Sequence, residues 1–97
     1  MVAPQYNFFT KINVTSTSFA SHLVSWNFNS IGFSFLNEAD ARAVVVEYSF
    51  DGTTVHGDLT PLLPSEGIVF DNRMVSKVWF RLVTAGTPAL VRVEAWK

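Results

Sequence analysis

Of the side chains that could bind a metal or transfer a proton, one close group lies around a predicted turn. Asp51, His56 and Asp58 lie within a short stretch, and carboxylate oxygens and imidazole nitrogens are ordinary metal ligands. The competing interpretation is local: Asp51 shapes the turn, while His56 and Asp58 end a polar strand and bond to nearby backbone. We favour the local interpretation, so the sequence predicts no metal site and no cofactor.

Nucleophilic catalysis needs a serine, threonine or cysteine beside a base that a third group holds in place. The chain has two histidines, His22 and His56, no cysteine and no Gly-x-Ser-x-Gly motif. We expect His22 to be a partly exposed strand residue, and Glu38, Asp40 and Arg42 to form a solvated turn. The sequence therefore predicts that the protein is not an enzyme.

Aromatic side chains offer a different chemistry, because flat rings stack on sugars and on unpaired bases. The three tryptophans, Trp26, Trp79 and Trp96, are the candidates for such a platform. Nucleic acid also requires a basic groove, and a formal net charge of -1 does not supply one. We therefore expect no nucleic acid partner, and we assign most of the nine phenylalanines to the core.

The composition limits the kind of domain that can hold these residues. A chain of 97 residues is the size of one domain, so we treat 1–97 as a single domain, with 1–5 as a possible N-terminal arm. The absence of cysteine excludes disulfides, and the apolar runs are too short for a membrane span. Charged residues make up 15% of the chain, where about 25% is usual. A surface poor in charge and rich in aromatic residues is typical of one that another subunit covers.

Apolar and polar residues alternate with period two along most of the chain, which predicts strands. The spacing of the strands predicts an all-β fold, an antiparallel β-sandwich or jelly-roll-like single domain. Asp51-Gly52 predicts a tight turn with a return strand at 53–59, and two prolines predict an irregular crossover at 60–67. The other predicted strands before the final pair are 6–14, 24–28, 31–35, 44–50 and 68–70.

The end of the sequence has the pattern of a hairpin, with strands at 75–83 and 89–96 joined by a turn at 85–88. Pairing of Ala85 with Pro88 sets its register. The apolar face of this hairpin is assigned to the core and consists of Ser76, Val78, Phe80, Leu82, Val91, Val93 and Ala95. The opposite face carries six candidate protein-interface residues: Lys77, Trp79, Arg81, Arg92, Glu94 and Trp96.

The predicted register places these six side chains on one surface. Trp79 then lies across from Glu94, and Lys77 lies across from Trp96. An ammonium group over the ring of Trp96 contributes about 0.5 to 1 kcal/mol. Tryptophan together with arginine on an exposed face is typical of protein contacts, so this surface is the predicted interface.

The same register sets Arg81 directly opposite Arg92. Like charges that face each other across a ladder are unfavourable. A carboxylate is therefore expected nearby, either that of Glu47 in the same chain or one from a neighbouring subunit.

Three stretches in the second half of the chain carry a family resemblance: 46–53 continuing through 55–59, then 70–73 with 75–81, and finally 91–96. They resemble a pattern in small structural proteins of tailed bacteriophages. The resemblance implies a virion component, such as a head decoration protein or a neck or tail accessory protein, and carries over no catalytic residues. The Tyr-Ser-x-Asp-Gly segment is also similar to hairpins of jelly-roll carbohydrate-binding domains of the discoidin type.

The resemblance and the low charge together predict a protein that acts by binding alone. The expected partners are further copies of the chain, as a homo-oligomer, and other virion proteins of the capsid, neck or tail. The expected location is the virion, assembled in the host cytoplasm. The alternative function is a carbohydrate-binding or adhesin β-sandwich module of a virion fibre, for which a glycan would be the ligand.

Overall fold

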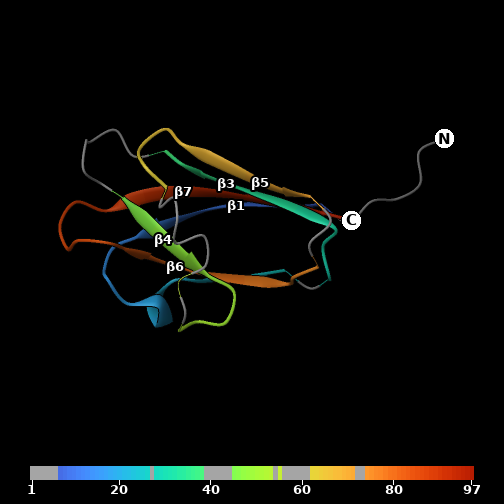
Figure 1. Ribbon diagram of the computed structural model, residues 1–97, viewed down its shortest axis with the longest axis horizontal. Coiled ribbons are helices and arrows are strands. Elements are labelled where there is room, and N and C mark those ends of the chain that lie inside the picture. Colours follow the sequence, from blue (N-terminus) through green and yellow to red (C-terminus); the bar gives the residue numbers. More distant parts are fainter. Residues whose placement is uncertain (1–6, 27, 39–44, 54, 56–61, 72–73) are drawn as a thin grey trace.

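A computed structural model of the chain describes residues 7–26, 28–38, 45–53, 55, 62–71 and 74–97 (Figure 1). These residues form strands and one short 3-10 helix. The elements are β1 (Asn7–Val14), η1 (Phe19–Ser21), β2 (Leu23–Ser25), β3 (Gly32–Asn37), β4 (Val46–Ser49), β5 (Gly67–Asp71), β6 (Lys77–Leu82) and β7 (Ala89–Trp96). The predicted all-β class is confirmed. Within the described residues, no helix has the length and apolarity needed to cross a membrane.

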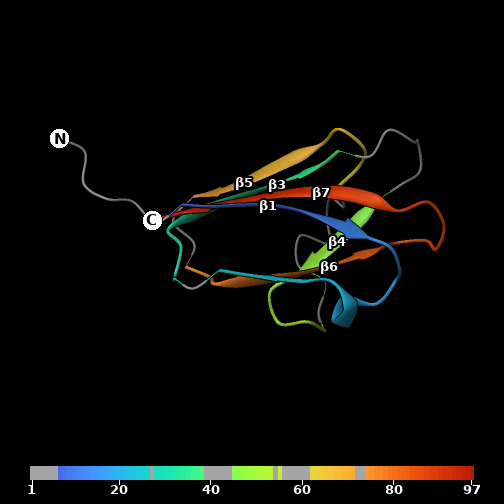
Figure 2. The same cartoon turned by 180° about the vertical axis from the view of Figure 1, so that it is seen from behind.

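The strands form two antiparallel sheets that face each other (Figures 1 and 2). The first sheet has four strands in the order β1-β7-β3-β5, and the second has three in the order β2-β6-β4. Every pairing between these strands is antiparallel. The prediction of an antiparallel β-sandwich is therefore confirmed.

The strands β6 and β7 are not hairpin partners, so the predicted register between them is wrong. Strand β6 pairs with β2 and β4 in the three-stranded sheet, whereas β7 pairs with β1 and β3 in the four-stranded sheet. The connection 83–88 passes from one layer to the other (Figure 1), and it is long enough to cross the roughly 10 Å between packed sheets. Each strand thereby gains two hydrogen-bonded neighbours where a lone hairpin offers one.

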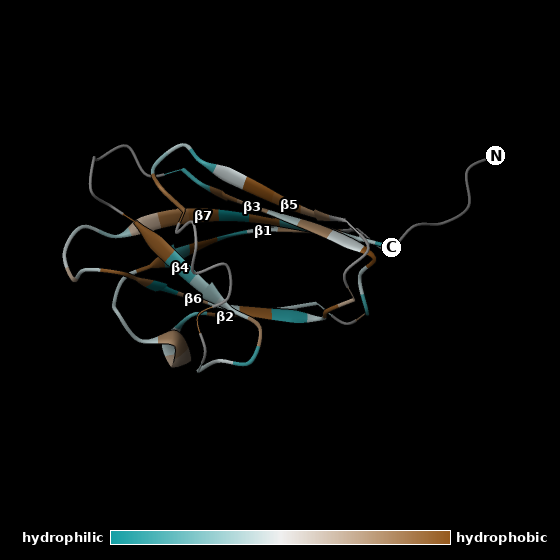
Figure 3. Ribbon diagram, in the orientation of Figure 1, coloured by the Kyte–Doolittle hydropathy of each residue, from teal (hydrophilic) through white to brown (hydrophobic). Residues whose placement is uncertain are grey.

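The core lies between the two sheets and is built by the inward-facing residue of each alternating pair. Figure 3 shows hydrophobic and hydrophilic residues alternating along the strands. The predicted alternation of β1 is confirmed, because Val14 is buried while Phe9, Lys11 and Asn13 are exposed. Six of the seven residues of the predicted core face of the final two strands are buried and meet across the sandwich: Val78, Phe80, Leu82, Val91, Val93 and Ala95. The seventh, Ser76, is only half-buried and precedes β6.

Aromatic rings fill the centre of the sandwich. Phe33 stacks on Phe70 with ring centres 4.7 Å apart, and Phe35 meets Phe80 edge to face at 5.0 Å. Tyr48 joins the same cluster through Phe35 at 5.3 Å. Pairs of this geometry contribute about 0.5 to 1.5 kcal/mol beyond the burial of their area. These contacts link β3 and β5 of one sheet to β4 and β6 of the other.

Several predictions fall on residues outside the described part of the chain. They are the N-terminal arm at 1–5, most of the return strand at 53–59 and the first residues of the crossover at 60–67. Of the described residues of that crossover, 62–66 are irregular apart from a bridge between Leu62 and Val46. Gly67 already belongs to β5, so its assignment to the crossover is wrong.

Candidate interaction surface

The six residues predicted to form one interface lie on two different outer faces of the sandwich. Lys77, Trp79 and Arg81 alternate with buried residues of β6 and belong to the outer face of the three-stranded sheet. The other three, Arg92, Glu94 and Trp96, alternate with buried residues of β7 and belong to the outer face of the four-stranded sheet. The predicted pairs across β6 and β7 are therefore wrong.

Arg81 on β6 is held by groups of its own chain. Its Nε donates a hydrogen bond to Oε1 of Glu47 at 2.9 Å, across the β4–β6 pairing. Its guanidinium carbon also lies 4.3 Å from the ring centre of Phe19 in η1. The prediction that Glu47 supplies a carboxylate beside Arg81 is confirmed.

Trp79 is likewise packed within the chain. The ammonium nitrogen of Lys77 lies 5.4 Å from the ring centre of Trp79, so the predicted stacking of Lys77 on Trp96 is wrong. On another part of the ring, a Cβ added to Gly52 would lie 3.1 Å from Cε2 of Trp79. The three β6 candidates therefore have internal contacts that account for their residue types.

The outer face of the four-stranded sheet carries a like-charge pair that the sequence prediction did not contain. Arg92 on β7 lies directly across from Lys11 on β1, which is unfavourable on its own. Glu94 compensates the charge of Arg92. Oε1 of Glu94 lies 2.7 Å from Nη2 and 3.1 Å from Nε of Arg92. Glu38, just after β3, compensates Lys11 with an Nζ to Oε1 distance of 3.2 Å. These four charged side chains are thus paired within the chain.

Exposed apolar side chains remain on this face beside the paired charges. One cross-strand row runs from Phe9 on β1 through Glu94 and Ser34 to Val69 on β5. Both ends of the row are exposed, Phe9 to 56% and Val69 to 62%. The guanidinium carbon of Arg92 lies 5.2 Å from the ring centre of Phe9. We call the exposed row ends and their neighbours the outer patch: Phe9, Val69, Arg92, Glu94 and Trp96.

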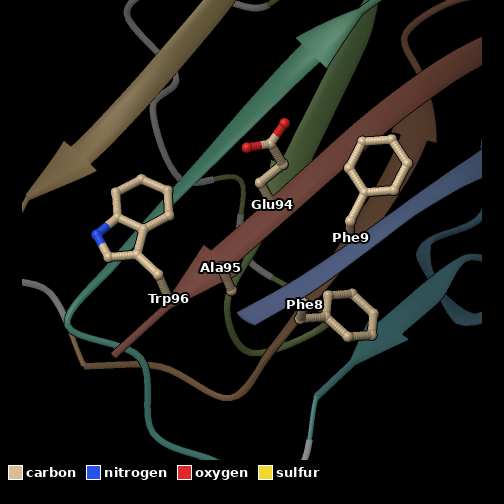
Figure 4. Close-up of a pocket in the computed structure, with 5 residues that line it drawn as sticks. All are labelled: Phe8, Phe9, Glu94, Ala95 and Trp96. Atoms are coloured by element: carbon tan, nitrogen blue, oxygen red, sulfur yellow. The ribbon is translucent and has the colours of Figure 1, made fainter. Parts of the chain in front are cut away.

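A hollow of about 300 Å³ borders the outer patch, lined by Phe8, Phe9, Glu94, Ala95 and Trp96 (Figure 4). Figure 4 shows the rings of Phe9 and Trp96 on either side of the Glu94 carboxylate. Strands β1 and β7 supply all five lining residues. The hollow therefore combines three aromatic rings with one acidic group.

Phe9 and Val69 are the interface candidates that the sequence analysis missed. In a strand over 6–14, Phe9 shares one face with Lys11 and Asn13. A phenylalanine on an otherwise polar strand face is the signal that could have singled it out. Val69 gave no such signal, because it lies between two apolar neighbours, Ile68 and Phe70.

The three tryptophans do not form a common platform. Trp26 is buried, and its Nε1 donates a hydrogen bond to the carbonyl oxygen of Val75 at 3.0 Å. Trp79 lies on the outer face of one sheet and Trp96 on that of the other. Trp96 borders the hollow, so it is the tryptophan with a position suited to an outside ligand.

His22 is buried, with 3% of its surface exposed, so the prediction of a partly exposed residue is wrong. Its Nδ1 lies 2.9 Å from the carbonyl oxygen of Ser18 and 3.1 Å from that of Phe80. Its Nε2 accepts the backbone N–H of Thr15 at 3.0 Å. These partners assign the neutral tautomer with hydrogen on Nδ1. The ring satisfies backbone groups from three segments, which is a structural role.

The described member of the suspected metal cluster has a local role. Oδ1 of Asp51 accepts the hydroxyl of Ser49 and the backbone N–H of Thr53, both at 2.8 Å. The turn interpretation of Asp51 is confirmed, and His56 and Asp58 lie outside the described residues. Among the residues that are described, no three potential ligands form a metal-binding group. Of the predicted solvated turn, Glu38 is described and pairs with Lys11, while Asp40 and Arg42 are outside.

Comparison with known proteins gave structural similarities alone. No protein-family model and no curated protein sequence matches the chain. An RmlC-like cupin protein from Desulfovibrio desulfuricans has 13% sequence identity and a TM-score of 0.47, over 95% of this chain and 80% of its own. The SPBc2 prophage-derived protein YomS has 10% identity and a TM-score of 0.44, over 100% of both chains. A de novo designed double-stranded β-helix has 15% identity and a TM-score of 0.38, over 98% of this chain and 100% of its own.

Proposed function

We propose that this protein is a structural subunit of a tailed-phage virion that binds neighbouring subunits through the outer patch. The observation that carries the proposal is the exposure of Phe9 and Val69 at the two ends of one row whose intervening charge is already paired. Exposed apolar groups with few free charges are typical of surfaces that a partner covers.

The pairing of charges on this face favours association. Removing an unpaired charge from water is costly, whereas Arg92 and Lys11 already have carboxylate partners in Glu94 and Glu38. Aromatic and arginine side chains also dominate the binding energy of many interfaces. A partner that brings an apolar surface to Phe9, Trp96 and Val69 would therefore bury area without breaking these ion pairs.

The assignment to a virion rests on the sequence. The resemblance to small phage structural proteins and the low charged fraction of 15% support it. A head decoration protein and a neck or tail accessory protein both fit a small, all-β subunit that acts by binding. Its partners would be other copies of this chain or proteins of the capsid, neck or tail.

The test uses phage particles from the strain that carries the gene, purified and analysed by quantitative mass spectrometry. We expect the chain in many copies per particle, and Val69→Glu to lower that copy number at least ~10-fold, because a buried charge without a partner opposes binding. Val83→Glu is the matched control, since Val83 is 45% exposed but lies on the connection 83–88. Particles that lack the chain, or that take up Val69→Glu like the control, overturn the proposal.

The hollow favours a second candidate function, carbohydrate binding by a fibre module. Phe9 and Trp96 flank the carboxylate of Glu94 there (Figure 4), and aromatic rings beside a polar group suit a sugar ring. Glycan-array binding that is lost in Trp96→Ala and kept in Trp79→Ala would favour this candidate over the first.

A further inference from the structure

Strand β1 forms an edge of the four-stranded sheet. Among the described strands it pairs with β7 alone. It is 8 residues long and holds neither proline nor glycine, while the edge strands β5, β2 and β4 have 5, 3 and 4 residues. An edge strand presents a row of backbone N–H and C=O groups to which another strand can add. The described part of the chain therefore offers its longest regular edge at β1.

The side chain that would usually protect such an edge is directed elsewhere. Lysine on an edge strand discourages pairing because its charge resists burial. Here the ammonium group of Lys11 lies 3.2 Å from Oε1 of Glu38. Glu38 follows β3, which lies on the far side of β7 from β1. The charge of Lys11 is therefore held over the sheet and away from the free edge of β1.

A hollow of about 330 Å³ runs beside this edge, between β1 and β2. Strand β1 lines it with Phe8, Thr10, Lys11 and Ile12, and β2 lines it with Leu23, Val24 and Ser25. The ammonium group of Lys11 is nevertheless paired with Glu38. Phe9 and Leu23, the outward residues that flank this side of the sandwich, are both exposed. An added strand would thus bury apolar side chains as well as backbone groups.

We propose that β1 pairs antiparallel with β1 of a second copy of this chain, about a two-fold axis that passes beside Thr10. In this register Thr10 faces Thr10 of the other copy, Phe8 faces Ile12, and Phe9 faces Lys11. Each pair occurs twice except the one on the axis, as in any isologous contact. The two four-stranded sheets become one continuous sheet, with both outer patches on the same side.

The side chains of β1 select this register over its neighbours. A two-fold axis perpendicular to the sheet leaves the cores of both copies on the same side of the joined sheet. In an antiparallel pair of identical strands, such an axis passes between a residue and the same residue of the other copy. An axis at Lys11 would place two lysines directly opposite each other, which is unfavourable. An axis at Phe9 would pair residues 7–11 alone, whereas the axis at Thr10 pairs 7–13.

The Thr10 register is also favourable in its own right. Threonine opposite threonine and aromatic opposite β-branched residues are stabilising cross-strand pairs. The ring of Phe9 can pack on the aliphatic stem of Lys11 while the ammonium group stays with Glu38. This self-complementarity is the reason to infer a second copy as the occupant of the edge.

Charged residues introduced at position 10, on the axis, test the inference. The measurement is sedimentation velocity of the purified full chain over a range of concentrations. We expect the wild type to form a dimer. Thr10→Lys and Thr10→Glu should each weaken it at least ~10-fold, because each variant places like charges on the axis. An equimolar mixture of the two should restore a dimer, since lysine then faces glutamate. Variants that had merely failed to fold would not form a dimer when mixed.

Asn13 provides the matched control, because it is exposed on the same strand but does not face itself in this register. Asn13→Lys and Asn13→Glu should each dimerise like the wild type. Cysteine variants add a second measurement, since the chain has no cysteine. Thr10→Cys should form an intermolecular disulfide, with Cβ atoms about 5 Å apart. Asn13→Cys should not, because the two copies of residue 13 lie about 20 Å apart along the strands.

Three outcomes overturn the inference: a wild-type chain that stays monomeric, a dimer that Thr10→Lys leaves intact, or Asn13→Cys cross-linking as readily as Thr10→Cys. The edge contact and the outer patch are different surfaces, so the inference does not depend on the proposed virion function. A dimer that survives Thr10→Lys but is lost in Val69→Glu would assign self-association to the outer patch instead.

Discussion

The indole of Trp96 on β7 covers Gly32, its register partner on β3. A Cβ added to Gly32 would lie 2.5 Å from Cε2 of Trp96. Real Cβ atoms do not come this close to a non-bonded atom. The absence of a side chain at position 32 is therefore what allows Trp96 to lie flat on the outer face.

Replacing Gly32 by alanine should lower the free energy of unfolding by about 1–3 kcal/mol, since the methyl group displaces the indole. Urea unfolding of the purified protein measures the loss. In a Trp96→Ala background the same substitution should cost much less, because the clash is gone. Equal costs in the two backgrounds would show that the contact is not the cause.

His22 connects Thr15, Ser18 and Phe80 through its ring. His22→Ala should lower the free energy of unfolding by about 2–4 kcal/mol, because buried backbone groups lose their partners and a cavity remains. Ser21→Ala, at an exposed neighbouring residue, should change it by less than about 0.5 kcal/mol. The structural role assigned to the ring is wrong if the two variants unfold at the same urea concentration.

Arg81 is held by Glu47 and Phe19, so its contribution belongs to folding rather than to partner binding. Arg81→Lys should cost about 1 kcal/mol of stability, because lysine lacks the planar group that stacks and bonds at once. Incorporation of the variant into particles should stay at the wild-type level. A variant of normal stability that fails to enter particles would contradict this assignment.

Gly52 follows Asp51 in the turn after β4 with a φ of 85°, a conformation that costs residues with a side chain about 1 kcal/mol or more. Gly52→Ala should therefore lower the free energy of unfolding by about 1–2 kcal/mol, with a further effect from the contact with Trp79. Gly52→Asn should cost less, because asparagine tolerates positive φ better. Thermal melts of the two variants compare them directly, and the reverse order would contradict the explanation.

Local patterns were sufficient to predict which side of β6 and of β7 faces the core. The alternation in β6 and β7 gave the buried residues correctly, because the period of two is a property of the strand itself. The same pattern could not say that the two strands belong to different sheets. A connection such as 83–88 has the same turn-forming composition whether it closes a hairpin or crosses the core.

Some predictions for surface residues were confirmed and others were wrong, because local patterns do not show which strands become neighbours. A carboxylate beside Arg81 was expected from a wrong register with Arg92, and of the two sources left open Glu47 is the one found, because β4 pairs with β6. His22 could not be placed, since one of its partners, Phe80, is distant in sequence and meets it only after β2 pairs with β6. Phe9 and Val69 were missed, although Arg92, Glu94 and Trp96 of the same patch were predicted, because Phe9 and Val69 come from β1 and β5, which no local pattern connects.

Strands β6 and β7 are interior strands of the two sheets, and both come from residues 77–96. During translation, the earlier strands must wait for this segment to leave the ribosome before either layer can close. Contacts between segments far apart in sequence also slow folding. Neither layer can be completed before this segment is available, so the folding of each layer depends on the same stretch of chain.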